Sequence, residues 1–511
     1  MVVRGRIKKG AYFDSVTLMT VAKRLTEMAD VVDAAAVMGS DGNKAILAAS
    51  SLTTSEFESA GDTDLLIGVQ ATSEAAAEQA LSAVDELLEQ VRQKNAASGD
   101  VRPRSLEGAV QILPDANLAL ISIAGRYAGH EARKALENGL HVMLFSDNVP
   151  LETEIALKQF AQKKRLMVMG PDCGSAIITG VPLAFANVVR RGPIGIVAAS
   201  GTGLQEVSTI VSNQGAGISQ GIGTGGRDVQ QEVGGIMFLA AMQALAEDED
   251  TRVIVLVSKP PAAKVLSRIE AKISEIDKPV VPVFLGAESR GPEAATTLLE
   301  AALRAVALAQ GTDSDEVTRL LTSREQEIVK RARKEAAGRS SGQKYLRGLM
   351  SGGTFVAECQ LLLCDKIGDV FSNAPLPPNQ KLSDSLVSQA NSVVDLGADE
   401  FTVGRPHPMI DYSLRKQRII AEANDPETAV ILLDVVLGYG AHPDPATELA
   451  AVVHAACQRV CVVCSITGTD QDPQNLTRTR ETLTVAGAIV MPSHAEASQL
   501  AGYIVKFRGE S

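Results

Sequence analysis

Three sequence blocks recur in the same order beyond residue 190, and this repetition constrains the fold more than any other feature. The aligned blocks are Gly195–Gly203 with Leu346–Thr354, Gly221–Asp228 with Asp395–Asp399, and Asp250–Val257 with Glu427–Asp434. The first block is an apolar run, a glycine turn and the start of a helical pattern, which is typical of a strand–turn–helix unit in a parallel sheet. Chance is a poor explanation for the preserved order, so the sequence predicts two copies of one flavodoxin-like unit.

The same alternation of β-rich runs, glycine turns and alanine-rich helical stretches extends over most of the chain and predicts the α/β class. A length of 511 residues corresponds to three or four domains of ordinary size. The expected segments are a small N-terminal α+β domain at 1–105, a Rossmann-like domain at 106–190, a first flavodoxin-like domain at 191–310, a connecting helix or linker at 311–344, and a second flavodoxin-like domain at 345–511.

Composition excludes several classes of protein. Lys and Arg total 49 against 61 Asp and Glu, and the net charge of −12 argues against a nucleic-acid or anionic-membrane partner. The chain shows no run of 18 apolar residues and no signal-peptide pattern, so we expect neither a membrane span nor secretion. Six cysteines are too few for a disulfide scaffold and indicate a reducing cytoplasm. Cys457, Cys461 and Cys464 have no matching second pair for zinc, so no metal site is predicted.

The two glycine turns of the repeat are the strongest candidates for a ligand site. Ser200-Gly201-Thr202-Gly203 follows a buried-type strand and opens a helix, and Ser351-Gly352-Gly353-Thr354 does the same in the second copy. A helix N-terminus offers free N–H groups and partial positive charge, and glycine lets an anion approach the backbone. If the copies pack face to face, both helix N-termini could point at one shared phosphate. The alternative is a pair of tight turns without a ligand.

Two further loops carry residues suited to anion chemistry. In Gly225-Gly226-Arg227-Asp228, Arg227 could hold an oxyanion and Asp228 could orient it; the alternative is a surface turn with an exposed ion pair. In Gly404-Arg405-Pro406-His407-Pro408, the prolines fix His407 and Arg405 adds anion affinity. We therefore take His407, Arg405 and Arg227 as catalytic candidates, although a loop histidine with a structural hydrogen bond is the alternative for His407.

Other polar residues receive weaker assignments. Lys259, at the carboxyl end of a strand, either faces the site or is solvated, and Asp434 at the matching strand end has a structural alternative. Cys173 could act as a nucleophile only with a base that the sequence does not show. The remaining histidines are expected at the surface, at helix caps or in structural positions: His130, His141, His442, His454 and His494.

The motifs Gly195-Ile196-Val197, Ser200-Gly201-Thr202, Gly223-Thr224-Gly225-Gly226 and Gly170-Pro171-Asp172-Cys173-Gly174 resemble the α subunit of succinyl-CoA synthetase. The final domain resembles the carboxy-terminal domain of that enzyme's β subunit. From residue 13 to residue 441 the chain resembles the FdrA family more closely, through the stretches FDSVTLM, PDANLALISIAG, VMLFSDNV, VMGPDCG, PLAFANV, GTGGRD, VGRPHPMID and DVVLGYGA. The resemblance implies a fused body with paired phosphate-facing helices, and it makes 106–190 a truncated CoA-binding-type domain.

Three departures from succinyl-CoA synthetase bear on the activity. The loop Ala287-Glu288-Ser289-Arg290-Gly291 has no histidine where that enzyme is phosphorylated, the first half of the CoA-binding domain is missing before Leu118, and the ATP-grasp domain is absent. These departures make a self-sufficient ATP-driven ligase doubtful, and no cofactor is assigned because CoA and nucleotide are doubtful as well.

The FdrA resemblance implies a subunit of a carbamoyltransferase, since the family includes a subunit of oxamate carbamoyltransferase in allantoin breakdown. The substrate would be phosphate or carbamoyl phosphate together with a small amide acid, and other protein subunits encoded nearby would complete an oligomeric enzyme. Two alternatives stay open. One is an acid–thiol ligase in which His407 replaces the lost phosphohistidine, and the other is a non-catalytic scaffold that senses an acyl phosphate or CoA.

Overall fold

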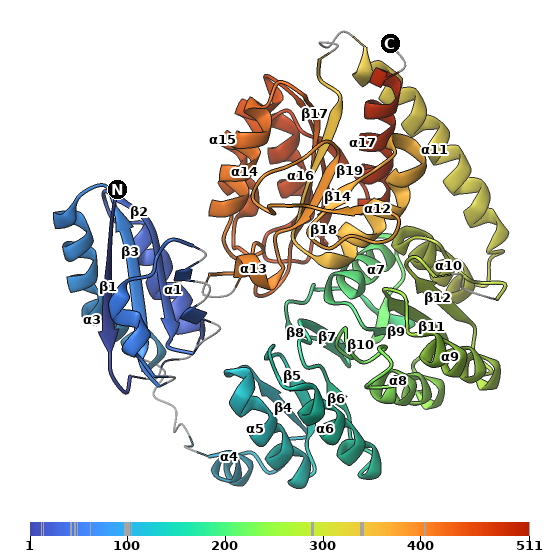
Figure 1. Cartoon of the computed structure of the whole chain (residues 1–511). Coiled ribbons are helices and arrows are strands. Elements are labelled where there is room, and N and C mark those ends of the chain that lie inside the picture. Colours follow the sequence, from blue (N-terminus) through green and yellow to red (C-terminus); the bar gives the residue numbers. More distant parts are fainter. Residues whose placement is uncertain are drawn as a thin grey trace. The chain divides into compact units, whose positions relative to one another are not determined.

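The computed structural model describes all residues except 12, 14, 41–42, 45–46, 49, 62, 97–102, 104, 288–290, 338–341, 403–404 and 510–511. The chain separates into two compact units (Figure 1). The first contains Met1–Asp115 and Ala398–His407, and the second contains Ala116–Gly397 and Pro408–Ser511.

The first unit is an antiparallel three-stranded sheet covered by helices. Its strands β1 (Val2–Lys8), β3 (Leu65–Ala71) and β2 (Val31–Met38) lie in that order. Helices α1 (Ser15–Thr26) and α3 (Glu74–Ala96) pack on the sheet, and the unit also contains η1 (Ser55–Ser59), α4 (Leu106–Ile112) and α13 (Asp399–Thr402). The small N-terminal α+β domain predicted from the sequence is therefore present. The segment 398–407 groups with it, although the sequence analysis assigned that segment to the last domain.

The second unit begins with half of a Rossmann-type sheet. Strands β4 (Leu118–Ile121), β5 (His141–Leu144) and β6 (Val168–Met169) are parallel, and helices α5 (Gly125–Glu137) and α6 (Leu151–Lys163) connect them. The domain boundary expected at 190 stays a prediction, but the sheet of the next domain extends to residues before it. Strands β7 (Ser175–Ile178) and β8 (Val181–Ala184) form a hairpin that pairs with the next sheet, because β7 bonds to β10 (Ile218–Gly223).

That next sheet has six strands in the order β12-β11-β9-β10-β7-β8. Its parallel part is β9 (Arg191–Ala198), β10, β11 (Val253–Ser258) and β12 (Val280–Phe284). Helices α7 (Gly201–Asn213), α8 (Ile236–Glu247), α9 (Ala263–Glu275) and α10 (Leu298–Gln310) follow these strands in turn. The four parallel strands have the flavodoxin-like order predicted for the first copy.

The last sheet has seven parallel strands in the order β15-β14-β16-β13-β17-β18-β19. The strands are β13 (Tyr345–Met350), β14 (Phe371–Ser372), β15 (Gln380–Lys381), β16 (Ser392–Asp395), β17 (Thr428–Val436), β18 (Cys461–Thr467) and β19 (Ile489–Met491). The helices are α12 (Gly353–Ile367), α14 (Ser413–Asn424), α15 (Pro445–Cys457), α16 (Leu476–Val485) and α17 (His494–Gly509).

The strand order confirms the internal duplication. β9 lies between β10 and β11, and β13 lies between β16 and β17, as the three aligned blocks require. The alignment of the first block is displaced by one residue, because the N-cap is Ser200 in α7 and Gly352 in α12. Thr202 is therefore equivalent to Thr354, and Ser351 stands one position before the cap.

The two flavodoxin-like copies share one hydrophobic core. A single cluster of buried side chains contains Ile196 of β9, Leu204 of α7, Leu346 of β13 and Phe355 of α12. The predicted connecting segment contains α11 (Asp315–Ala336), which lies against α17 and adds side chains to this core (Figure 1). The copies therefore form one body, and their central helices α7 and α12 are placed by packing from both sides.

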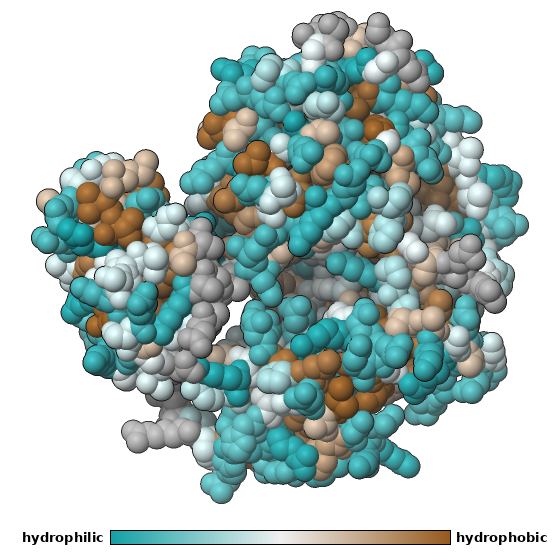
Figure 2. Space-filling view, in the orientation of Figure 1, coloured by the Kyte–Doolittle hydropathy of each residue, from teal (hydrophilic) through white to brown (hydrophobic). Residues whose placement is uncertain are grey.

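The visible face of the chain is mostly hydrophilic, with apolar side chains gathered in small patches (Figure 2). Among the described residues, no helix is both long enough and apolar enough to cross a membrane.

Candidate functional site

The first element of the site is the N-terminus of α7. Strand β9 is buried from Ile194 to its end at Ala198, so the chain turns at the carboxyl edge of its sheet. Ser200 is the N-cap residue, with extended backbone angles, and its Oγ accepts a hydrogen bond of 2.9 Å from the N–H of Gly203. This cap fixes where the helix begins.

The second element is the N-terminus of α12, which lacks a side-chain cap because the N-cap residue is Gly352. The preceding residue, Ser351, is held instead by the buried carboxylate of Asp434 in β17. Asp434 Oδ1 accepts the Ser351 N–H at 2.8 Å, and Oδ2 accepts the Ser351 hydroxyl. Behind it, buried Arg415 of α14 donates Nη1 to the Asp434 carbonyl oxygen at 2.5 Å. These contacts are those of a residue with a structural role, which is the alternative given for Asp434 in the sequence analysis.

These two helix N-termini meet in a reciprocal contact. The hydroxyl oxygens of Ser200 and Thr354 lie 2.5 Å apart, which joins the N-cap of α7 to the second residue of α12. The converse contact joins Gly352 to Thr202: a Cβ atom at Gly352 would lie 2.6 Å from Thr202 Cγ2. Because each helix N-terminus carries partial positive charge, the contact brings two such charges together.

A lysine and a carboxylate lie beside the α12 N-terminus. A Cβ atom at Gly353 would be 2.7 Å from Lys259 Nζ and 2.8 Å from Asp395 Oδ2. Lys259 follows β11 of the first copy and is exposed, whereas Asp395 ends β16 of the second copy and is nine-tenths buried. From the sequence, Lys259 is expected either to face the site or to be solvated; it is exposed, and its Nζ lies beside the start of α12.

The second glycine loop, with Gly225 and Gly226, lies beside the residue that follows β9. Gly226 is exposed near Ala199, since its Cβ position is 3.8 Å from the Ala199 carbonyl oxygen. Gly225 has a φ of +81°, and a Cβ there would lie 2.3 Å from the Pro171 carbonyl oxygen, so this position requires glycine. The loop therefore lies at the same sheet edge as the α7 N-terminus.

Asp228 does not orient Arg227, and that part of the prediction is wrong. The buried Asp228 carboxylate accepts hydrogen bonds from Lys158 Nζ and from the N–H of Phe238, each within 2.8 Å. Its partners are therefore buried groups of the protein interior. Arg227 Nε pairs with Glu154 Oε2 at 2.9 Å, and Arg227 Nη2 donates to the Val149 carbonyl oxygen. The oxyanion role of Arg227 stays a prediction.

Arg405 and His407 belong to the first unit, whereas the helix N-termini belong to the second. Arg405 Nη2 lies 2.5 Å from Asp33 Oδ2 of β2. Burial raises the pKa of Asp33, and the Arg405 charge opposes that effect. Gly404 of the same motif lies outside the described residues. The catalytic assignments of Arg405 and His407 stay predictions.

Sequence reasoning missed two buried glutamates. Glu206 and Glu358 are the sixth residues of α7 and α12, and both contact His494, the first residue of α17. Glu206 Oε1 accepts the His494 backbone N–H at 2.9 Å, and Glu358 Oε2 lies 2.8 Å from His494 Nδ1. Burial raises the pKa of Glu206. The equal spacing of the two glutamates from their glycine turns is the signal that could have revealed them.

His494 begins a helix, as a cap residue would, but it is fully buried rather than at the surface. Its ring stacks on Phe355 with centroids 4.4 Å apart. Because Phe355 follows Thr354 in α12, His494 lies close behind the helix that carries the site.

Cys173 is buried, and burial raises the pKa of its thiol to about 12, so a thiolate nucleophile is not favoured there. In the part of the chain that the structure describes, no group of three or more His, Cys, Asp and Glu side chains could hold a metal ion.

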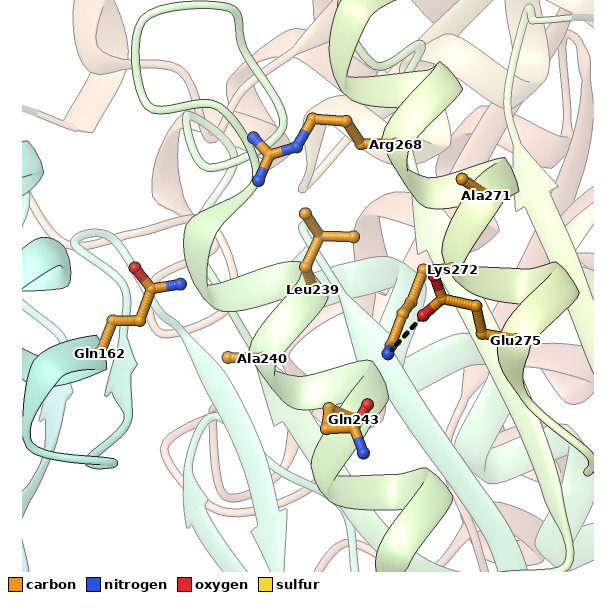
Figure 3. A pocket seen from close by; sticks show the side chains of 8 residues that line it. All are labelled: Gln162, Leu239, Ala240, Gln243, Arg268, Ala271, Lys272 and Glu275. Carbon is orange, nitrogen blue, oxygen red and sulfur yellow. Dashed lines mark hydrogen bonds and ion pairs between the residues drawn. The ribbon is translucent and has the colours of Figure 1, made fainter.

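A pocket lies away from this site, on helices α6, α8 and α9 (Figure 3). Its charged side chains are engaged locally: Lys272 Nζ pairs with Glu275 at 2.9 Å, and Arg268 donates to the Gly234 carbonyl oxygen. The pocket is lined by Gln162, Leu239, Ala240, Gln243, Arg268, Ala271, Lys272 and Glu275. Both cationic side chains that line the pocket therefore already have a partner within the chain.

Comparison with protein-family models assigns three segments of the chain. A model described as CoA-ligase matches residues 349–504, and one described as a CoA binding domain matches residues 190–286. The second match covers the first flavodoxin-like copy, whereas the sequence analysis placed the CoA-binding-type domain at 106–190. A model described as the AllF heavy metal-associated domain matches residues 1–103.

A curated relative covers almost the whole chain. YahF of Escherichia coli K12, described as an uncharacterized protein, is 41% identical over 98% of both chains. The α subunits of ADP-forming succinate–CoA ligase from Archaeoglobus fulgidus and Aquifex aeolicus are each 26% identical over 34% of this chain. The matches cover 59% and 57% of those subunits, so less than two thirds of their length is represented.

Solved structures also align with the chain. A dinucleotide-forming acetyl-coenzyme A synthetase from Candidatus Korarchaeum cryptofilum covers 76% of this chain and 82% of its own, at 14% identity and a TM-score of 0.29. PH0766 from Pyrococcus horikoshii covers 80% and 89%, at 15% identity and a TM-score of 0.33. With both scores below 0.5, the fold assignment rests on the strand order described above.

The heavy metal that the name of the N-terminal model implies does not fit these residues. Residues 1–103 contain neither a cysteine nor a histidine. Soft and borderline metals are held mainly by thiolate and imidazole ligands, so this domain lacks the donors for such an ion.

Proposed function

Because the chain belongs to the FdrA family together with YahF, and is similar to succinate–CoA ligases, we propose that it is one subunit of a transferase that moves a carbamoyl group to or from phosphate. The proposed reaction is that of oxamate carbamoyltransferase in allantoin breakdown. Inorganic phosphate and an N-carbamoyl amide acid react to give carbamoyl phosphate and the free amide acid. Other subunits complete the enzyme, and the chain acts in the cytoplasm.

The contact between the two helix N-termini is the observation that carries this proposal. Ser200 and Thr354 join the first turns of α7 and α12, so the two helix N-termini are next to each other. N–H groups at a helix start favour a phosphate, and Lys259 adds a full positive charge nearby. This arrangement supports a site for phosphate oxygens.

Preorganised positive charge also suits the transfer step. Attack of phosphate on a carbamoyl carbon develops negative charge on the carbonyl oxygen. Donors fixed in place before the reaction stabilise such charge without reorganising, and one donor of this kind commonly contributes about 3–4 kcal/mol. Ser351 and Ser200 are each anchored by hydrogen bonds, which supports a rigid site on this chain.

The test is reconstitution. The full chain is combined with the subunits encoded beside it, and phosphate-dependent loss of N-carbamoyl oxamate is followed with production of carbamoyl phosphate. We expect turnover that requires both phosphate and this chain. A matched assembly carrying Gly352→Ala should lose it, because the Cβ would separate the helix N-termini. An assembly that contains all subunits and transfers no carbamoyl group would contradict the proposal.

An acid–thiol ligase is the second candidate, and the CoA-ligase and CoA binding domain matches favour it. That activity requires activation of an acid, with a phosphorylated histidine as one route. The ligase would label the chain with ³²P from γ-labelled ATP in an acid-labile form, and His407→Ala would remove the label. Carbamoyl transfer predicts an unlabelled chain. Phosphate or CoA binding without any turnover would instead indicate a sensing scaffold.

A further inference from the structure

Resting on the proposed carbamoyl transfer, we propose that Lys259 and Asp395 are the charged groups that touch the reacting molecules. Lys259 binds phosphate, and Asp395 carries the proton from phosphate to the nitrogen that leaves the carbamoyl carbon. In the proposed reaction the leaving group is the free amide acid, whose nitrogen needs that proton when its bond to the carbamoyl carbon breaks. The two groups come from different copies of the duplicated unit.

The geometry at Gly353 supports this pairing. Lys259 Nζ and Asp395 Oδ2 lie 2.7 and 2.8 Å from the same point, the Cβ position of Gly353, which is the first residue of α12. A side chain at residue 353 would displace both groups. Glycine at this position therefore allows the ammonium and the carboxylate to lie together at the helix N-terminus.

The carboxylate of Asp395 is held firmly. Its Oδ1 accepts the N–H of Gly397 at 2.9 Å, and its backbone exchanges hydrogen bonds with the Asn373 side chain, at 2.8 and 3.0 Å. Its Oδ2 lies beside Gly353. A carboxylate that is nine-tenths buried and fixed through its other oxygen keeps one oxygen at a constant position beside the helix start.

Lys259 differs from Asp395 in exposure, and that difference fits its role. It is exposed at the carboxyl end of β11 and precedes Pro260 and Pro261, which restrict the backbone that carries it. A lysine ammonium on a flexible stem is a mobile point charge that can follow a phosphate as it enters and reacts. Asp395 repels the same phosphate, so the two side chains have opposite effects on phosphate binding.

The chemical step balances with these groups. An oxygen of HPO₄²⁻ forms a bond to the carbamoyl carbon, and the bond from that carbon to the amide nitrogen breaks with its electron pair going to nitrogen. Asp395 accepts the phosphate proton and delivers it to that nitrogen. Lys259 keeps its proton and offsets negative charge on phosphate. No oxidant, reductant or nucleotide is consumed.

Binding of inorganic phosphate to the full chain tests the opposite charges directly. Calorimetric titration should give at least about tenfold weaker binding for Lys259→Ala, since a charge-assisted hydrogen bond is lost. Lys259→Arg should retain binding, and Asp395→Asn should bind more tightly than wild type. Lys264→Ala and Asp277→Asn, which change exposed side chains on and after α9, serve as matched controls without effect. Unchanged affinity in Lys259→Ala or weaker binding in Asp395→Asn would overturn the assignment.

Turnover of the reconstituted enzyme tests the proton role. Asp395→Asn should lower kcat by about 100-fold or more without raising the KM for phosphate, because general acid–base groups commonly contribute that much. The limb of the pH–rate profile that reports a carboxylate should disappear. Retention of kcat would refute the role of Asp395 in an enzyme that otherwise works.

The outcomes separate the two proposals. In one outcome, the wild-type assembly turns over while the Lys259→Ala and Asp395→Asn variants keep the phosphate affinity and turnover of wild type. That result would reject only the residue assignment. Absence of turnover, with the predicted opposite effects on phosphate affinity, would reject carbamoyl transfer while Lys259 remained a phosphate ligand. A wild-type chain that binds no phosphate would reject both.

Discussion

The hydroxyl oxygens of Ser200 and Thr354 lie 2.5 Å apart although the residues are separated by 154 positions in the sequence. Ser200 caps α7, and Thr354 is the second residue of α12. The hydrogen bond therefore joins the starts of the two equivalent helices, although Ser200 and Thr354 are not themselves equivalent, since Thr354 corresponds to Thr202. It fixes the helix N-termini against each other before any ligand arrives.

Removing this hydrogen bond should lower stability in a coupled way. Ser200→Ala loses the cap of α7 as well as the contact with Thr354, and caps contribute about 0.5–2 kcal/mol. A double-mutant cycle with Thr354→Val, measured by urea unfolding, should give a coupling energy of about 0.5–1.5 kcal/mol. Independent effects of the two substitutions would show that the hydroxyl contact contributes nothing.

Glycine should be required at residue 352 and replaceable at residue 201. A Cβ at Gly352 would lie 2.6 Å from Thr202 Cγ2, whereas a Cβ at Gly201 meets only Ser175 Oγ at 3.5 Å. Gly352→Ala should therefore lower the unfolding midpoint, by overpacking of about 1–3 kcal/mol, and Gly201→Ala should not. The Gly352→Ala/Thr202→Ala double variant should recover part of the loss. If the double variant is no more stable than Gly352→Ala, contact with Thr202 is not the cause of the lost stability.

Asp434 and Arg415 should be sensitive to loss of either partner. Both side chains are buried, with exposures of 0% and 1%, and Arg415 Nη2 forms an ion pair with Asp434 Oδ1 at 3.5 Å. Removing one member of a buried ion pair leaves the other charge uncompensated and typically costs about 3–5 kcal/mol. Arg415→Met should therefore destabilise the chain in chemical denaturation, whereas Arg478→Met at an exposed ion pair should have little effect. Equal effects would mean that Asp434 does not depend on Arg415.

Glu206 should make stability depend on pH. Because burial raises its pKa above the usual value of 4.5, the folded chain holds this proton more tightly than the unfolded chain does. Its contribution is complete below pH 4.5 and declines as the pH rises through the folded-state pKa. Glu206→Gln, which cannot ionise, should gain stability relative to wild type between pH 5 and pH 8 in thermal unfolding. A constant difference across that range would contradict the raised pKa.

The duplicated unit could be predicted because each of its strands and turns has a recognisable pattern of neighbouring residues. Apolar runs ending in glycine turns identify β9, β13 and the helices after them, and their repetition gives the strand order. The alignment was displaced by one residue at Ser351, because Gly and Ser occur in both turns and only the capping geometry distinguishes Gly352 as the N-cap.

Contacts between residues far apart in the sequence were harder to predict from the sequence. The β7–β8 hairpin follows a Rossmann-type segment in sequence, and only its pairing with β10 assigns it to the next sheet. Asp228 stands next to Arg227, yet Lys158, 70 positions away, binds its carboxylate. The convergence of Glu206 and Glu358 on His494 likewise depends on packing between the copies, which residue spacing alone does not determine.

The most direct test of the paired helix N-termini as one anion site is equilibrium dialysis of the full chain against ³²P-labelled inorganic phosphate. We predict saturable binding of one phosphate per chain, lost in Gly352→Ala and retained in Gly201→Ala. A wild-type chain that retains no phosphate, or a Gly352→Ala chain that retains as much as wild type, would contradict the account.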